Sequence, residues 1–165
     1  MNLKAYYGLP KKVVFCKKSL ISNQRPNSSI EFKHKSNSKK STLNIDKNGI
    51  SDFGENYLQE SLEKISKLKD LKINWHFIGN IQSNKCEEIA KNFDWIHTID
   101  RLKIARLIDK YCPEDKCIKC LIQINIDNEE SKSGIKFEEV ENFLNEIRGL
   151  NKIKLCGLMI IPNPN

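Results

Sequence analysis

From about Ile50 onward, short apolar runs alternate with longer stretches in which apolar residues recur every three or four positions. The short runs have the length and the β-branched and aromatic content of strands, whereas the longer stretches have the period of amphipathic helices. This alternation predicts an α/β fold in which single helices join parallel strands.

The expected strands cover residues 50–53, 75–78, 95–99, 118–126 and 154–161, the last being a sixth strand if another lies near the start of the chain. The expected helices turn these residues inward: Leu58, Leu62, Ile65 and Leu68; Cys86, Ile89, Ala90 and Phe93; Leu102, Ala105, Leu107 and Ile108; Phe137, Val140, Leu144 and Ile147. Ser83 and Asp100 are placed to cap the second and third helices, and Glu63 and Lys67 to pair on the polar face of the first.

Units of this kind suit either a doubly wound sheet or a β/α barrel, and strand spacing does not choose between them. An eight-stranded barrel needs roughly 250 residues. A barrel built from these 165 residues would therefore be open.

Length and composition indicate one soluble domain, with 39% hydrophobic residues to form a core. No stretch reaches the roughly 18 apolar residues of a membrane helix, and the run Val13 to Cys16 is too short for a secretory signal. An organelle transit peptide is the minor alternative, because acids are absent before Glu31. We expect a cytoplasmic protein.

The net charge of +7 comes from the first third of the chain, where residues 1–50 hold eleven of the 28 lysines and arginines but two of the 21 acids. A basic arm can bind nucleic acid, but polar stretches such as Ser36 to Thr42 favour a solvated, poorly ordered segment. We therefore expect a divergent basic segment at 1–46, no nucleic-acid partner, and the folded domain at 47–165.

The six cysteines are scattered through expected strands and helices, which favours reduced thiols over a disulfide framework. Cys117 and Cys120 have the spacing of a zinc or redox pair, but no second pair accompanies them. Burial of Cys120 in a strand is the favoured interpretation, and no metal is expected.

Five groups of residues resemble the pyridoxal phosphate homeostasis proteins, a family with a single barrel similar to the N-terminal domain of alanine racemase. They are Phe53-Gly54-Glu55-Asn56-Tyr57-Leu58-Gln59-Glu60; Trp75-His76-Phe77-Ile78-Gly79 with Gln82-Ser83-Asn84-Lys85; His97-Thr98-Ile99-Asp100; Gln123-Ile124-Asn125 with Glu130-Ser131-Lys132-Ser133-Gly134; and Gly157-Leu158-Met159 before Pro162. The resemblance covers about residues 47 to 163, in family order.

This resemblance implies an incomplete (β/α)8 barrel of the TIM type with about six β/α units. It implies a non-enzymatic carrier that holds pyridoxal 5'-phosphate (PLP) for vitamin B6 homeostasis, with PLP-dependent apo-enzymes as recipients. A degenerate, non-functional copy is the main alternative, and an amino-acid racemase-like enzyme is a further one.

In such a barrel the matching residues fall at the carboxyl ends of strands, where cofactor sites are built. The resemblance implies that Asn56, His76 and Met159 contact the cofactor. Each has a structural alternative, namely an Asn in a turn, a buried neutral His and a Met in the core. Lys85 and Lys132 could attract a phosphate, although solvated lysines are the default.

Family members carry the lysine that forms an imine with PLP about eighteen residues before the Phe of the first motif. That spacing leads to Lys35, our choice for this role. The local pattern Leu20 to Pro26 instead puts Asn23 at the lysine position, and an amide cannot form the imine. Lys18, after the run Val13 to Cys16, is the third option.

Family members also continue beyond the last motif through a further helix and two strands, whose loops hold the phosphate. Nothing here matches them, so we expect a truncated chain that a C-terminal fragment could complete. An unclosed sheet exposes an edge strand and an apolar face, which predicts aggregation.

Overall fold

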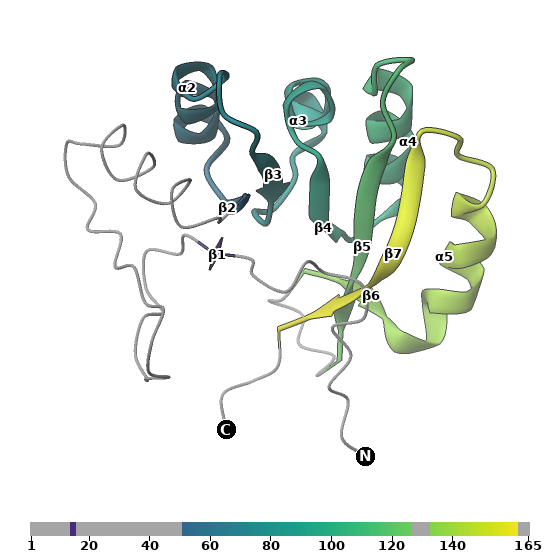
Figure 1. Ribbon diagram of the computed structural model, residues 1–165. Helices are drawn as coiled ribbons and strands as arrows, with labels where there is room; N and C mark the ends of the chain where they lie inside the picture. Colours follow the sequence, from purple (N-terminus) through teal and green to yellow (C-terminus); the bar gives the residue numbers. More distant parts are fainter. Residues whose placement is uncertain (1–13, 16–50, 127–132, 162–165) are drawn as a thin grey trace.

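The computed structural model describes residues 14–15, 51–126 and 133–161, and it forms one parallel sheet with helices along one side (Figure 1). The strands are β1 (Val14–Phe15), β2 (Asp52–Glu55), β3 (Asn74–Phe77), β4 (Trp95–Ile99), β5 (Ile118–Asn125), β6 (Ile135–Lys136) and β7 (Ile153–Ile160). The α-helices are α2 (Leu58–Lys67), α3 (Cys86–Asn92), α4 (Leu102–Tyr111) and α5 (Val140–Ile147), with 3-10 turns η1 (Ser83–Lys85) and η2 (Phe137–Glu139).

The strand order is the order of a β/α barrel. Neighbours in the sheet run β1-β2-β3-β4-β5-β6, β7 also pairs with β5, and every pairing is parallel. Adding each strand beside its predecessor, with the helices on one face, is the way a β/α barrel is built. The expected α/β fold is therefore confirmed as part of such a barrel.

The two faces of the sheet have different chemistry. The outer face, which packs against the helices, is apolar and contributes to the core Phe53, Trp75, Phe77, Ile96, Ile99, Ile118, Cys120, Ile122 and Ile124. Side chains on successive residues of a strand alternate between faces, and a register shift between Ile96 and Ile99 interrupts this alternation in β4. The inner face therefore receives Asp52, His76, Trp95, His97 and Gln123, all of them buried.

A bulge in β7 sets which residues of that strand reach the inner face. Cys120 pairs with Leu155, but Leu121 pairs with Gly157, so Cys156 is an extra residue on β7. Gly157 has φ of +155°, a backbone conformation that favours glycine. Beyond the bulge Gln123 pairs with Met159, which places both side chains on the inner face.

Most expected elements are confirmed, with bounds shifted by one or two residues. The strand expected at 50–53 lies at Asp52–Glu55, and the strand at Trp95–Ile99 is as predicted. The expected pair on α2 is present, with Lys67 Nζ 3.7 Å from a Glu63 carboxylate oxygen. Cys120 is fully buried, as expected.

Three local predictions are wrong. Ser83 does not cap α3, because it is the first residue of η1, and Lys85, at the N-cap of α3, makes no side-chain cap bond. Asp100 does not cap α4, because its carboxylate binds the neighbouring Arg101 guanidinium instead. Phe137 does not face the core. It lies in η2 and is 65% exposed.

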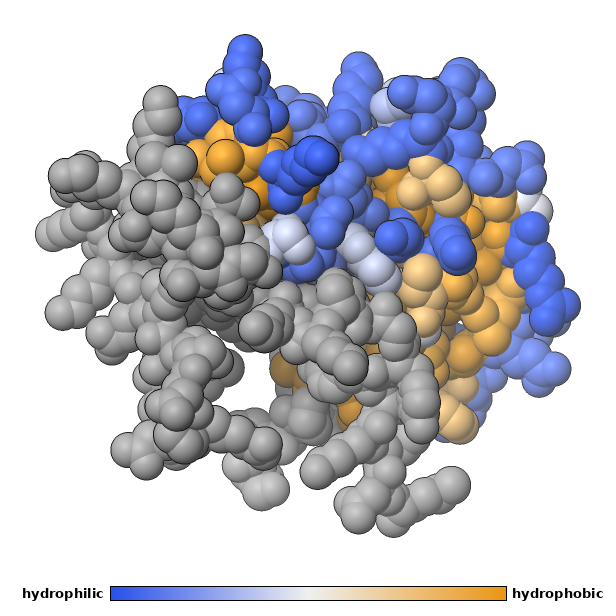
Figure 2. All heavy atoms as spheres, viewed as in Figure 1, coloured by the Kyte–Doolittle hydropathy of each residue, from blue (hydrophilic) through white to orange (hydrophobic). Residues whose placement is uncertain are grey.

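One part of the outer face is not covered by any helix of the described residues. Leu158 on β7 is 46% exposed, and a groove of about 260 Å³ opens between β7 and α5, lined by Leu144, Ile147, Arg148, Leu150, Ile153 and Leu155. Figure 2 shows the corresponding apolar surface where α5 and β7 lie, on the right of the view.

Apart from β1, the basic segment at 1–46 lies outside the described residues, and so does Lys132. In the part of the chain that is described, none of the helices is long and apolar enough to cross a membrane.

Candidate functional site at the carboxyl ends of the strands

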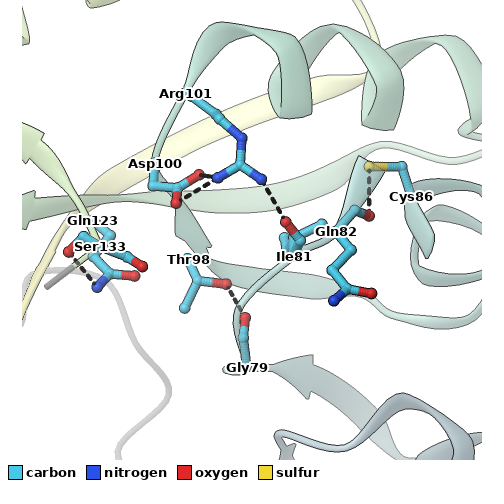
Figure 3. Close-up of polar contacts among 9 residues, drawn as sticks. All are labelled: Gly79, Ile81, Gln82, Cys86, Thr98, Asp100, Arg101, Gln123 and Ser133. Carbon is cyan, nitrogen blue, oxygen red and sulfur yellow. Dashed lines mark hydrogen bonds and ion pairs between the residues drawn. The ribbon is translucent and has the colours of Figure 1, made fainter. Parts of the chain in front are cut away.

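The loops that follow β2 and β3 lie in direct contact. A Cβ atom at Gly79 would be 2.3 Å from the backbone oxygen of Asn56, so only a residue without a side chain allows this approach. The Thr98 hydroxyl at the end of β4 donates to the Gly79 carbonyl oxygen at 2.6 Å (Figure 3). Three successive strand ends are thereby held together.

Arg101 fixes the next part of the loop after β3. Its Nη2 donates to the Ile81 carbonyl oxygen at 2.7 Å, and its Nη1 binds both Asp100 carboxylate oxygens at 2.7 and 2.8 Å (Figure 3). Burial raises the pKa of Asp100, although the Arg101 charge opposes that shift. The start of α4 is thus tied to the loop after β3.

Gln123 occupies the inner face of β5 near its carboxyl end. Its side chain is 5% exposed, and its Nε2 donates to the Ser133 carbonyl oxygen at 2.9 Å (Figure 3). Its Oε1 is buried and has no hydrogen-bond partner among the described residues. Gly134, with φ of +133°, brings the returning chain against β5, because a Cβ there would be 2.6 Å from the Asn125 nitrogen.

A chain of buried polar groups lies deeper on the inner face. His76 Nε2 is 3.1 Å from Asp52 Oδ1, and His76 Nδ1 is 2.9 Å from His97 Nε2. An ionised carboxylate can only accept a hydrogen bond, so His76 Nε2–H donates to Asp52. His76 Nδ1 is then an acceptor, and His97 Nε2–H donates to it. The His76 ring also stacks on Trp95, with centroids 5.4 Å apart.

Both histidines in this chain favour the neutral form. Burial lowers the pKa of His76, and the hydrogen bond and charge of Asp52 oppose that shift. Burial, with a smaller contribution from His76, lowers the pKa of His97 to about 4. The pair is therefore uncharged at neutral pH.

Three of the four expected cofactor-binding residues fall among the described residues. Asn56 is half-buried just after β2, Met159 is half-buried on β7, and His76 is fully buried in β3. Both ring nitrogens of His76 are engaged by protein groups, so contact with a bound molecule would use its ring carbons. Lys35 lies outside the described residues.

The expected phosphate-attracting residue Lys85 lies 3.9 Å from Glu88 in an exposed ion pair. Among the described residues, no group of three His, Cys, Asp or Glu side chains is arranged to hold a metal. The described part of the site is built from amides, hydroxyls, imidazoles and the buried Asp52 carboxylate, with the ion pairs Asp100–Arg101 and Lys85–Glu88 nearer the surface.

Thr98 and Gln123 stand within the groups of residues that resemble the family, but the sequence predicts no site role for either of them or for Arg101. Thr98 and Arg101 bind carbonyl oxygens 19 and 20 residues earlier, which no local pattern marks. Gln123 could have been found as a polar residue between two isoleucines of an apolar strand, because alternation places it opposite the core.

The family model for "Alanine racemase, N-terminal domain" matches residues 37–163. The chain belongs to this family. Within it, the chain is similar to the pyridoxal phosphate homeostasis proteins of Pseudomonas aeruginosa, at 46% identity over 117 residues, and of Escherichia coli K12, at 48% over 120 residues. Each alignment covers 70% of this chain and 51% of the relative. The chain therefore spans about half the length of the curated relatives it matches.

Solved structures of similar chains agree with the fold. PipY of Synechococcus elongatus without PLP superposes with a TM-score of 0.70 at 29% identity, covering 75% of this chain and 59% of PipY. PipY with PLP bound gives 0.67 at 28%, covering 76% and 59%. An alanine racemase of Clostridium difficile 630 gives 0.58 at 15% identity, covering 73% and 31%, which shows the shared fold alone.

Proposed function

We propose that this chain binds pyridoxal 5'-phosphate at the carboxyl ends of its strands and acts in PLP homeostasis as a non-enzymatic carrier. The observation that carries the proposal is the 46–49% identity of this chain with pyridoxal phosphate homeostasis proteins over 117 to 120 residues. PipY, a structural neighbour at 28% identity, has PLP bound.

The residues at this edge fit such a group. The buried Gln123 Oε1 lacks a partner among the described residues, and the contact of Gly79 with Asn56 holds the loops after β2 and β3 together at this edge. Asn56 would bond the ring substituents, Met159 would supply an apolar contact, and His76 would contribute ring carbons. PLP supplies an aldehyde that condenses with a lysine amine.

The candidates for the lysine that condenses with the PLP aldehyde are Lys35 and Lys18. Lys35 has the spacing typical of the family. The pairing of β1 (Val14–Phe15) with β2 supports Lys18, because Lys18 follows β1 by three residues and the carboxyl ends of parallel strands meet at one edge. If Asn23 stands at the equivalent position, neither lysine serves.

A carrier needs no second acid–base group facing the lysine, whereas a racemase does. The alanine racemase neighbour supports the fold alone at 15% identity, so the carrier takes precedence over the enzyme. We also propose that the chain acts in the cytoplasm and that PLP-dependent apo-enzymes receive the cofactor from it.

The test is to incubate the full chain with PLP, reduce it with borohydride and locate pyridoxyl-lysine by peptide mass spectrometry. We expect one predominant modified lysine, and its replacement by Arg should abolish the label while the same change at the other candidate leaves it. Labelling spread over many lysines, equal in native and urea-unfolded protein, would overturn the proposed function.

A further inference from the structure

Gln123 has a buried side-chain amide of which only the nitrogen forms a hydrogen bond with the described residues. The residue is 5% exposed, its Nε2 donates to the Ser133 carbonyl oxygen, and its Oε1 has no hydrogen-bond partner in the part of the chain that the structure describes. Leaving a buried acceptor without a hydrogen bond costs stability, so such an atom in a native protein calls for a physical reason.

The orientation of this amide is fixed by its surroundings. Exchanging the oxygen and nitrogen positions would set Gln123 Oε1 against the Ser133 carbonyl oxygen, and two acceptors repel. The free atom is therefore the acceptor oxygen, and a molecule that satisfies it must bring an N–H or O–H donor.

The position of Gln123 directs this oxygen away from the core. Ile122 and Ile124 on either side belong to the core, so the Gln123 side chain lies on the inner face, in register with Met159. It stands at the edge where the loops after β3 and β5 are anchored.

We infer that Gln123 Oε1 is the hydrogen-bond acceptor that recognises a donor on the ring of the bound cofactor, an inference that rests on the proposed function. The phosphate oxygens of the cofactor are acceptors too, so they repel Gln123 Oε1. This oxygen therefore faces the ring. The ring of PLP offers two donors of this class, the 3-hydroxyl and the protonated ring nitrogen. Gln123 would thus set the orientation and the selectivity of binding.

The experiment compares the full chain with its Gln123→Met variant, which keeps the side-chain size and removes both polar atoms. Apparent affinities are measured by absorbance for PLP, for an analogue without the 3-hydroxyl, and for an analogue in which C–H replaces the ring nitrogen. The intrinsic effect of each ring change on condensation is the same in both proteins and cancels in the ratio of affinities.

For at least one analogue, we expect the ratio of PLP affinity to analogue affinity to be about 3- to 10-fold higher in wild type than in Gln123→Met. This factor corresponds to one neutral hydrogen bond. Gln59→Met, the same change at an exposed position of α2, should keep the wild-type ratio. Gln123→Glu, which retains an acceptor oxygen, should keep the preference even though its tie to Ser133 is lost, and it serves if Gln123→Met does not fold.

Two results would overturn the inference. Equal ratios in wild type and Gln123→Met for both analogues would mean that Gln123 only ties the loop, or that water satisfies its oxygen, and the carrier function would stand. No saturable binding of PLP by wild type would instead overturn the proposed function, and this inference with it.

Discussion

Two buried residues, His76 and His97, make the stability of the fold sensitive to acid. Imidazole in the unfolded chain binds a proton near pH 6.5, whereas the pKa of His97 in the folded chain is about 4. The unfolded state thus holds more protons between these values, and folding stability is complete above pH 6.5 and falls as the pH drops toward 4. At about 1.4 kcal/mol for each pKa unit, the loss amounts to about 3 kcal/mol.

We expect the free energy of unfolding to decrease between pH 6.5 and 4.5, and to decrease less in His97→Gln, which does not titrate. Urea unfolding at each pH measures both. Comparing the two proteins removes the contribution of other groups such as Asp100, whose raised pKa acts in the opposite direction. Parallel pH profiles would contradict the assignment to His97.

Helix α2 offers two lysine–glutamate pairs that differ in burial. Lys64 Nζ lies 2.6 Å from a carboxylate oxygen of Glu55, with side-chain exposures of 25% and 8%. Lys67 and Glu63 are 3.7 Å apart and 59% and 74% exposed. Removing the cation from a buried ion pair destabilises the fold, because the buried carboxylate loses a counter-charge. Exposed ion pairs contribute little to stability.

We expect Lys64→Met to lower the free energy of unfolding by about 2 kcal/mol, somewhat below the usual penalty because Lys64 is a quarter exposed. The matched change Lys67→Met should alter it by less than about 0.5 kcal/mol. Urea denaturation followed by circular dichroism gives both values, and equal losses would show that the Glu55 contact does not anchor α2 to β2.

The elements of this fold follow from sequence periodicity, while their ends do not. Trp95–Ile99 and β5 are marked by short, mostly apolar runs that are buried on both faces of the sheet. Ser83 and Asp100 have the residue types of helix caps, but Asp100 has a stronger partner in Arg101. Competition between nearby polar partners is decided by geometry that the sequence does not contain.

The candidate site was predictable only as far as local patterns reach. Alternating strands and helices predict the carboxyl edge of the sheet as the place of a site, and the family resemblance implies Asn56 and Met159 as residues of that site. The ties of Thr98 to Gly79 and of Arg101 to Ile81 join different β/α units. Contacts of that range depend on how the sheet curves, so they required the structure.

At the scale of the whole molecule, the uncovered outer face beside β7 favours self-association. Leu158 is 46% exposed next to the apolar groove between β7 and α5. Exposed apolar surface on a strand invites contact between copies.

We expect sedimentation velocity to show association that grows with protein concentration and is reduced in Leu158→Lys. Asn145→Lys, which adds the same charge on the exposed side of α5, should associate like wild type. Monomers at all concentrations in wild type would show that this face does not drive association.

The extra residue Cys156 has a consequence for comparing this strand with its counterparts in other chains. Without the bulge, Gln123 would stand opposite Leu158, and Met159 would turn to the helix side. A homologue without the extra residue would keep the equivalent of Met159 opposite Gln123, but an ungapped alignment would match Met159 with the next residue along, which faces the helices. Transfer of a binding role to Met159 by alignment is therefore sound only where the extra residue is shared or a gap stands in its place.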